Sequence, residues 1–546
     1  MVSLLEVISA RMQAVTHIDP ELRLSTKPAF GHYQCNVALR LAKETGRNPR
    51  DIAKEIVEEL DISDLCEPLE IAGPGFINIR IRADRLGEAV TTHLADPHGG
   101  IPQQESPQRV VVDYSAPNVA KPMHVGNLRS TIIGDCLVRV LRAVGNIVIP
   151  QNHIGDWGTQ FGMLVEQILD EDIDPTTLTL ETSVELYQRA QTHFRSDEDF
   201  MEAARKRVVA LQSGDEETIR IWQTLIEVSK VGFNQAYARL GVLLTDEDLA
   251  GESMYNFMLD AVATDLEDLG LATEDNGALC VFLDEGDSPL IVRKSDGGYG
   301  YSTTDLAAIR YRVDALTADR IIYVVGSPQS HHFEQVFATA TLANWLSCEV
   351  RAEHVGFGSV LGPDGKMFKT RDGKAVTLDT LLDAAEEVAT PEVAMAAVKY
   401  ADLSNGLHKD YVFDVTRMTA TTGDTGPYLQ YAHARVSQIL RRAEADGDVV
   451  DDNNAEIQAL TEPAEELLAL TLSRFPEVVE DVAENLQPHK LCGYLFELAT
   501  YLSVFYEQCP VLHSEERSSR LVLCRATQRV LATGLDLLGI HAPHTM

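Results

Sequence analysis

The stretch VVVDYSAPNVAKPMHVGNLRSTIIGDCLVRVLRAVGNIVIPQ, residues 110–151, decides the fold. Its first seven residues form an apolar, β-branched run that is typical of a buried strand. A helix is expected from near Val125, where the apolar residues keep helical spacing, and Gly145 can end it. A second strand, NIVIPQ, follows at 146–151. Strand, helix and strand in this order predict the opening of a doubly wound parallel sheet.

The rest of the chain divides into three expected domains around this stretch. Residues 1–105 mix helical and strand patterns, which predicts an α+β domain. Residues 106–380 hold the α/β sheet, with a second buried strand at 320–327 and an acidic, mostly helical insertion at about 165–290. Helical periodicity dominates residues 381–546, which predicts an all-helical C-terminal domain.

The composition excludes several classes of protein. The chain has 546 residues, of which 45% are hydrophobic and 24% charged, so it is neither disordered nor collagen-like. It has no run of 18 apolar residues, so we expect no membrane span, and its first residues are too polar for a signal peptide. The eight cysteines are scattered without a CxxC pair, which predicts reduced thiols in a cytoplasmic protein and no zinc site.

The net charge of -37 argues against general attraction to nucleic acid. The charge is unevenly spread, however. No Lys or Arg occurs between Arg239 and Arg293, whereas Lys366, Lys369 and Arg371 lie close together. An RNA partner would therefore be bound through local contacts and stacking, against a repulsive background.

Two short motifs carry candidate phosphate chemistry. PNVAKPMHVGN (117–127) lies between a strand end and a helix N-terminus, where α/β sheets bind ligands and where Lys121 and His124 can donate to phosphate oxygens. GPDGKMFKTRDG (362–373) is a basic segment between glycines, which could carry Lys369 onto a triphosphate. Taken singly, a structural histidine and a solvated basic turn are the commoner interpretations.

Together the two motifs resemble the signatures of class I aminoacyl-tRNA synthetases. Further blocks resemble the arginyl-tRNA synthetase family, and the likeness runs essentially from end to end. These blocks are AGPGFIN (72–78), NHIGDWGTQFGML (152–164), YSTTDLAAIRYR (301–312), VGSPQSHHFEQVF (325–337), AVKYADLSNG (397–406), GPYLQYAHARV (426–436) and the closing LLGIHAPHTM. The resemblance implies a class I Rossmann-like catalytic domain and a helical C-terminal anticodon-binding domain.

The resemblance also implies how ATP is handled. His124, Lys369 and Lys121 would stabilise the charge that builds on the phosphates of ATP, which brings its own Mg²⁺. The family's fourth position in the first motif is often His but is Asn127 here, and an amide can donate a hydrogen bond without carrying charge. The ATP-binding residues implied are His124, Gly126, Asn127, Lys366, Met367 and Lys369.

A guanidinium requires carboxylates in planar geometry beside an aromatic wall. Tyr301 and Asp305 are four residues apart at an expected helix start and so share a face. By resemblance, Asp305 and Asp113 hold the guanidinium, Tyr301 packs beside it, and Asn118 and Gln329 hold the amino and carboxylate end. Without the family, a helix N-terminal acid that complements the dipole would be the commoner role for Asp305.

A metal site at the adjacent His331 and His332 is not expected, because neighbouring side chains point apart on any regular element. His332 matches an active-site position of the family. No other pattern in the sequence indicates a metal held by protein ligands.

A C-terminal helix that starts at Pro427 has an apolar face, and Tyr428, Tyr431 and Arg435 form the stripe beside it. Aromatic rings and arginines on one exposed face suit unstacked anticodon bases. Tyrosines packed on a neighbouring helix are the alternative. The family match favours tRNA binding.

The implied activity is ligation of L-arginine to tRNA-Arg through an arginyl-adenylate, with release of AMP and pyrophosphate. The resemblance further implies a monomer whose N-terminal domain contacts the D-loop elbow of tRNA and whose first step needs cognate tRNA. No DNA or membrane partner is expected. Two alternatives are a non-catalytic tRNA-binding paralogue and another class I adenylate-forming ligase.

Overall fold

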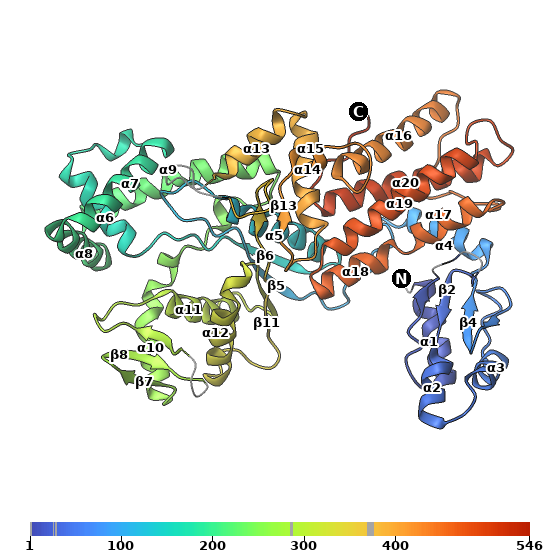
Figure 1. Ribbon diagram of the computed structural model, residues 1–546, viewed down its shortest axis with the longest axis horizontal. Helices are drawn as coiled ribbons and strands as arrows, with labels where there is room; N and C mark the ends of the chain where they lie inside the picture. The colour runs from blue at the N-terminus through green and yellow to red at the C-terminus, as the bar shows by residue number, and fades with distance from the viewer. Residues whose placement is uncertain (1–2, 26, 28–29, 284–287, 369–375) are drawn as a thin grey trace.

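The computed structural model describes residues 3–25, 27, 30–283, 288–368 and 376–546 and is drawn in Figure 1. The molecule is elongated, with a parallel sheet near its middle. Helices of the insertion extend to one side of the sheet and the C-terminal helices to the other. The N-terminal domain projects from the C-terminal helices.

The central sheet and its first crossover helix consist of β5 (Arg109–Asp113), α5 (Val125–Ala143), β6 (Ile147–Gln151), β10 (Arg320–Tyr323) and β11 (Arg351–His354). The strands are all parallel in the order β11, β10, β5, β6. The middle of β5 is fully buried, as its β-branched run predicts. The predicted doubly wound α/β sheet is confirmed.

The insertion begins with helices that lie beside the sheet. They are α6 (Thr159–Asp170), η2 (Pro175–Thr177), α7 (Leu180–Ser196), α8 (Glu198–Ser213), α9 (Glu216–Leu240), η3 (Asp246–Asp248) and η4 (Glu252–Tyr255). Each of the longer helices from α7 to α9 begins at a Thr or Asp whose side chain accepts a hydrogen bond from the first turn.

A second hydrophobic core, to which Val111 of β5 and Ile321 of β10 contribute from the other face of the central sheet, includes the elements that follow the insertion helices. These elements are α10 (Asn256–Asp268), β7 (Ala272–Asp275), β8 (Ala278–Val281), β9 (Leu290–Arg293), α11 (Tyr301–Asp314), η5 (Ser327–Gln329) and α12 (Ser330–Leu342). The three strands form an antiparallel sheet, which departs from the helical expectation for this part of the insertion. Asn276 and Gly277 both have positive φ and make the tight turn of the first hairpin, a local signal that outweighs the acidic composition.

The C-terminal part is helical after residue 412. Two short strands, β12 (Val360–Leu361) and β13 (Tyr411–Val412), lie before and after the helices α13 (Leu378–Glu386) and α14 (Pro391–Leu403). The helices that follow are α15 (Val415–Met418), α16 (Gly426–Ala445), α17 (Pro463–Ser473), α18 (Phe475–Asn485), α19 (His489–Gln508) and α20 (Arg517–Leu537). The predicted helical C-terminus is confirmed, and the boundary expected at 380 falls within α13.

The N-terminal part is α+β, as predicted. Its elements are α1 (Leu4–Thr16), β1 (Arg23–Leu24), β2 (Tyr33–Cys35), α2 (Val37–Thr45), α3 (Pro49–Glu59), β3 (Glu70–Ala72), β4 (Phe76–Ile79) and α4 (Ala83–Ala95). The strands form an antiparallel sheet in the order β1, β2, β4, β3. Helix α4 packs on α17 and α20, so it links the small domain to the C-terminal helices.

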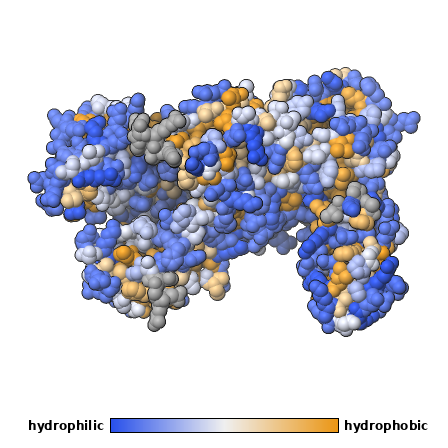
Figure 2. Space-filling view, in the orientation of Figure 1, coloured by the Kyte–Doolittle hydropathy of each residue, from blue (hydrophilic) through white to orange (hydrophobic). Residues whose placement is uncertain are grey.

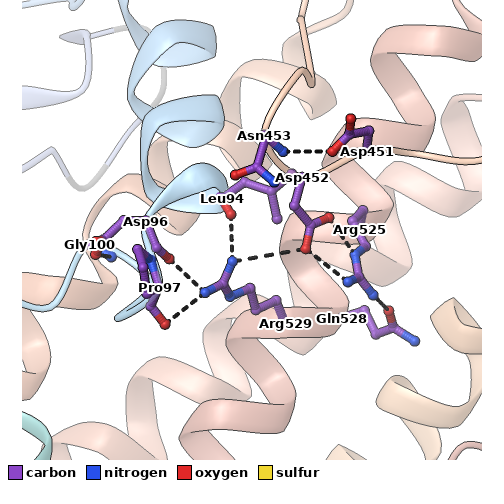
Figure 3. Close-up of polar contacts among 10 residues, drawn as sticks. All are labelled: Leu94, Asp96, Pro97, Gly100, Asp451, Asp452, Asn453, Arg525, Gln528 and Arg529. Carbon is purple, nitrogen blue, oxygen red and sulfur yellow. Dashed lines mark hydrogen bonds and ion pairs between the residues drawn. The ribbon is translucent and has the colours of Figure 1, made fainter.

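One arginine fixes the end of α4 to α20 (Figure 3). The guanidinium of Arg529 donates to the carbonyl oxygens of Leu94, Asp96 and Pro97, and Asp452 lies on its other side. The last carbonyls of a helix lack partners within the helix, and a cation there also complements the helix dipole. This contact therefore caps α4 and holds the N-terminal domain against the C-terminal helices.

A buried ion pair fixes α5 to the C-terminal helices. Nε of Arg129 lies 3.2 Å from Oδ1 of Asp402 on α14, and its Nη1 donates to the carbonyl oxygen of Lys409 at 2.9 Å. Both charged side chains are almost fully buried. Because α14 packs on α16, the helix that begins at the first motif is connected through one intermediate helix to the expected tRNA-binding face.

Hydrophilic residues cover most of the face seen in Figure 2, with hydrophobic residues in small groups between them. Among the described residues, no helix combines the length and the hydrophobicity needed to cross a membrane.

Candidate functional site

The first motif forms a strained loop between β5 and α5. Ser115, Ala116 and Ala120 have φ values of 73°, 46° and 58°, in the left-handed region that ordinary residues avoid. Such residues cost on the order of 1–3 kcal/mol each and gather at functional sites. The loop leaves the carboxyl end of a central strand, the edge at which open α/β sheets bind ligands.

His124 is the N-cap of α5 and is exposed to solvent. Its Nδ1 accepts a hydrogen bond from the backbone N–H of Gly126 at 3.0 Å, so the neutral ring carries its proton on Nε2. Partial desolvation and the charge of Lys121 lower the pKa of His124. A Cβ atom on Gly126 would lie 2.7 Å from the ring, which explains the glycine. The site therefore offers a neutral N–H donor at a helix N-terminus.

The side chain of Asn127 holds the backbone at His124 by hydrogen bonds. Its Oδ1 accepts a hydrogen bond from the backbone N–H of His124 at 3.0 Å, and its Nδ2 donates to the carbonyl oxygen of Ser115 at 3.2 Å. The side chain is buried. This differs from the expected contact with ATP, because both ends of the amide are engaged within the loop.

Lys121 extends toward the insertion. Its Nζ lies 4.7 Å from the centre of the Tyr187 ring on α7, a cation–π distance. The lysine is half-buried beside His124, so a positive charge stands near the cap of α5.

The segment that follows the second motif is held against the first motif by backbone hydrogen bonds. The N–H of Val125 donates to the carbonyl oxygen of Val376 at 3.3 Å, and the N–H of Leu378 donates to that of Met123 at 2.9 Å. The segment that follows the basic loop is thus paired with the segment that holds His124. Of the loop itself, Lys366 and Met367 are exposed, and Lys369 lies outside the described residues.

Tyr301 and Asp305 share a face of α11, as their spacing predicts. Nε2 of His332 on α12 lies 2.6 Å from Oδ2 of Asp305, and the rings of Tyr301 and His332 are 4.8 Å apart. The Tyr301 side chain is 64% exposed, although it lies beside these two partly buried groups. An aromatic wall and a carboxylate therefore meet at the open edge of the sheet.

Glu252, on η4, is a functional candidate that the sequence patterns did not indicate. Burial and the negative charges of Asp156 and Asp305 raise its pKa to about 7. Among the described residues, no cation or hydrogen-bond donor pairs with its carboxylate. Unpaired, desolvated acids mark functional sites, and the arrangement suits a cationic ligand. The only sequence signal was the lack of Lys and Arg in this segment.

Asp113 has an internal partner. Its Oδ2 accepts a hydrogen bond from Nη2 of Arg312 at 2.7 Å, and Nε of the same arginine donates to Gln151 at 2.6 Å. Arg312 is fully buried. This differs from the expectation that Asp113 holds a substrate guanidinium, because a guanidinium from α11 already binds this carboxylate beneath the site.

Asn118 and Gln329 lie at the ends of neighbouring strands. Asn118 follows β5 and forms a parallel bridge with Gly155, and Gln329 ends η5 after β10. Both side chains are exposed. Both side chains are therefore accessible at this edge of the sheet.

Tyr428, Tyr431 and Arg435 line a shallow pocket of about 50 Å³ between α16 and α19. The guanidinium of Arg435 lies 3.9 Å from the centre of the Tyr506 ring. Tyr428 is half-buried and contacts Phe496, whereas Tyr431 is exposed. The pocket has a cationic, aromatic wall that could hold a base.

No group of three or more His, Cys, Asp or Glu that could hold a metal occurs in the described part of the chain. His331 and His332 contact different acids, Glu334 and Asp305 respectively, so they do not converge on one point.

Three family models match the chain. They are the "Arginyl tRNA synthetase N terminal domain" over residues 3–81, "tRNA synthetases class I (R), catalytic domain" over 89–395 and the "DALR anticodon binding domain" over 429–546.

Relatives and solved structures agree with these matches. The arginine–tRNA ligase of Cutibacterium acnes is 61% identical over 100% of both chains, and that of Thermobifida fusca is 51% identical over 97% of this chain and 95% of its own. The arginyl-tRNA synthetase from Plasmodium falciparum superposes with a TM-score of 0.84 at 29% identity over 100% of both chains. The Thermus thermophilus enzyme gives 0.81 at 26% identity over 99% of both. The likeness thus extends over all parts of the molecule.

Proposed function

Since this chain belongs to the arginyl-tRNA synthetase family and attaches L-arginine to tRNA-Arg with ATP, we propose that both steps take place at the edge of the sheet formed by the ends of β5 and β10. The carboxylate of arginine attacks the α-phosphate of ATP in line, pyrophosphate leaves, and an arginyl-adenylate forms. A ribose hydroxyl at the 3′ end of tRNA-Arg, the 2′-hydroxyl as in class I enzymes, then takes the arginyl group, and AMP leaves.

The observation that carries arginine recognition is the acidic pair formed by Glu252 and Asp305 beside Tyr301. Burial and the negative charges of Asp156 and Asp305 raise the pKa of Glu252, and a guanidinium between Glu252 and Asp305 would neutralise both carboxylates. His332 orients Asp305 through the 2.6 Å contact, and the Tyr301 ring supplies the aromatic wall. Asp113 acts from beneath, since its pairing with Arg312 fixes α11 against β5.

The amino and carboxylate end of arginine lies between Asn118 and Gln329 in this proposal. Both are exposed near the ends of adjacent strands, and Asn118 lies in the strained loop itself. That placement directs the reacting carboxylate toward phosphates at the N-terminus of α5.

ATP binds at the N-terminus of α5, between the two motifs. The Nε2–H of His124 donates to the phosphates as charge builds there, Gly126 allows their close approach, and Lys121 adds positive charge. Lys366, Met367 and Lys369 contribute from the second loop, and the pairing of Val125 with Val376 joins the segment after this loop to the segment that holds His124. Asn127 holds the cap instead of contacting ATP. Mg²⁺ accompanies the phosphates of ATP, and no protein ligands are assigned to it.

The pocket at Tyr431 and Arg435 is the proposed contact with anticodon bases. Replacing Arg435 with Ala is expected to raise the KM for tRNA about tenfold, because base stacking on such groups contributes about 1–3 kcal/mol. Arg442→Ala is the matched control, since Arg442 is exposed on the same helix and does not line the pocket. Aminoacylation over a range of tRNA concentrations measures the effect. Equal losses in both variants would indicate only general charge attraction.

The three parts of the chain divide the work on tRNA-Arg in this proposal. Residues 1–105 contact the tRNA elbow, 106–380 carry the chemistry and 381–546 bind the anticodon, in a monomer that binds no DNA. The arrangement of α4 on α17 and α20 supports a fixed spacing between the first and last of these parts. A cytoplasmic location is supported by the cysteines, all of which are free thiols and all but Cys348 buried.

Arginine-dependent exchange between ATP and pyrophosphate tests the function. Exchange is expected with arginine and an arginine-accepting tRNA together, and we expect little without tRNA. Exchange without tRNA would keep the arginine assignment and remove the tRNA requirement. A folded protein that exchanges in neither condition would instead be a non-catalytic tRNA-binding paralogue, and exchange with a different amino acid would identify another ligase.

A further inference from the structure

We propose that Tyr237 and Ser229, on α9 of the insertion, are positioning residues for arginine activation: they hold the strained loop between β5 and α5 in its active shape. Neither residue belongs to the two motifs, and α9 begins about a hundred residues after the loop in the chain. The inference rests on the proposed site, because it concerns the loop that carries Asn118, Lys121 and His124.

Tyr237 bonds to the strained part of the loop and to its support. Its hydroxyl lies 2.7 Å from Oγ of Ser115 and accepts a hydrogen bond from Nδ2 of Asn152 at 2.9 Å. The Oδ1 of the same Asn152 accepts from the backbone N–H of Ala116 at 3.1 Å. One tyrosine hydroxyl is therefore connected to both consecutive residues with positive φ.

Ser229 reaches the third strained residue. Its Oγ accepts a hydrogen bond from the backbone N–H of Ala120 at 2.8 Å. Ser229 and Tyr237 are two helical turns apart and therefore lie on one face of α9. Both are buried, with exposures of 0% and 4%, so water cannot replace these bonds.

The contacts made by Tyr237 and Ser229 affect the chemistry because the residues proposed to bind arginine and ATP lie next to them in the loop. Asn118 stands between the two points held by Tyr237 and Ser229, and Lys121 and His124 follow directly. Lys121 itself lies against Tyr187, so a second insertion helix contacts the same loop. A strained backbone persists only where surrounding groups hold it, and reacting groups lose rate steeply when they shift. The insertion thus acts as the fixed support of the phosphate-binding loop.

Replacing Tyr237 with Phe keeps the ring and removes the hydroxyl. We expect kcat for arginine-dependent exchange, measured with saturating tRNA, to fall about tenfold, while the KM for arginine stays within about threefold. Tyr494→Phe is the matched control: it removes a buried tyrosine hydroxyl that donates to Thr471 in the C-terminal helices, far from the loop. Both variants should lose similar thermal stability, but only Tyr237→Phe should also lower kcat. A purely structural tyrosine would give the two variants the same kcat.

A double-mutant cycle shows whether the hydroxyl acts through the loop. The loss in Tyr237→Phe/Ser115→Ala should be at least about threefold smaller than the product of the single losses, because the two hydroxyls share one contact. Losses that multiply fully would overturn the proposal. If Tyr237→Phe unfolds, Ser229→Ala tests the same claim, and wild-type kcat in that variant would overturn it.

The same assay separates this inference from the site on which it rests. His124→Asn measured in parallel should be much slower than wild type. A slow His124→Asn with normal Tyr237→Phe and Ser229→Ala refutes only the positioning role. Normal rates in all three variants refute the placement of ATP at this loop as well.

Discussion

Glu252→Gln is expected to raise the KM for arginine by at least about 30-fold. The substitution keeps the shape of the side chain and removes one of two carboxylates proposed to hold the guanidinium. Truncating one partner of a desolvated charge pair costs about 2–5 kcal/mol, and each 1.4 kcal/mol is a factor of ten. The KM for ATP should change little, because the charges that act on Glu252 are those of Asp156 and Asp305, and neither His124 nor Lys121 is among them.

The same residue predicts a pH dependence. The pKa of Glu252 is raised to about 7, so the carboxylate is charged above that pH and neutral below it. The guanidinium of arginine stays cationic throughout this range. The KM for arginine should therefore rise as the pH falls below 7, by up to about tenfold per pH unit, and it should level off above 7. In Glu252→Gln this dependence should largely disappear.

The matched control is Glu247→Gln, because Glu247 is an exposed acid five residues earlier in the chain. Its arginine KM and its pH profile should match wild type. An unchanged KM in Glu252→Gln would remove Glu252 from the arginine site, and Asp305→Asn would then show whether Asp305 binds arginine alone.

His124→Asn is expected to lower kcat for exchange by about 10²–10³, the loss typical of removing one preorganised donor to a developing charge. Asparagine can still accept the hydrogen bond from the N–H of Gly126, so the cap of α5 is kept, but it is too short to replace Nε2. The KM for arginine should stay within a few-fold, since the acidic pair is untouched.

His331→Asn serves as the control for this variant, because His331 is exposed and contacts only Glu334 among the described residues. It should keep the wild-type rate. A His124→Asn protein with normal kcat and an intact fold would show that the phosphates are stabilised by the lysines alone.

Local patterns predicted correctly the elements on which the candidate site lies. The β-branched run before residue 113 predicts β5, and the helical spacing after Val125 predicts α5. Both predictions succeed because the conformation of a strand or helix depends mainly on residues close together in the chain. Tyr301 and Asp305 share a face of α11 because helical periodicity requires it. The motif at 117–127 lies at the strand end, as the order of elements predicts.

Partners that lie far apart in the chain could not be predicted in this way. Asp113 was expected to bind substrate, but Arg312, which is 199 residues away, reaches it through the packing of α11 on the sheet. Glu252 belongs to no local pattern and becomes a candidate only because the fold buries it near Asp305. Asn127 looked like a phosphate contact, and only the geometry of the cap shows that its amide is already engaged.

The sequence by itself determined the fold class, the family and the two loops proposed to carry the chemistry, because these depend on short-range spacing and on motifs along the chain. Only the tertiary structure decided which polar groups of the described residues are left without a partner and which hold the loop, among them Glu252, Arg312 and Tyr237. The reason is physical: a buried hydrogen bond or charge pair depends on how helices and strands pack against one another, and local periodicity does not specify that packing.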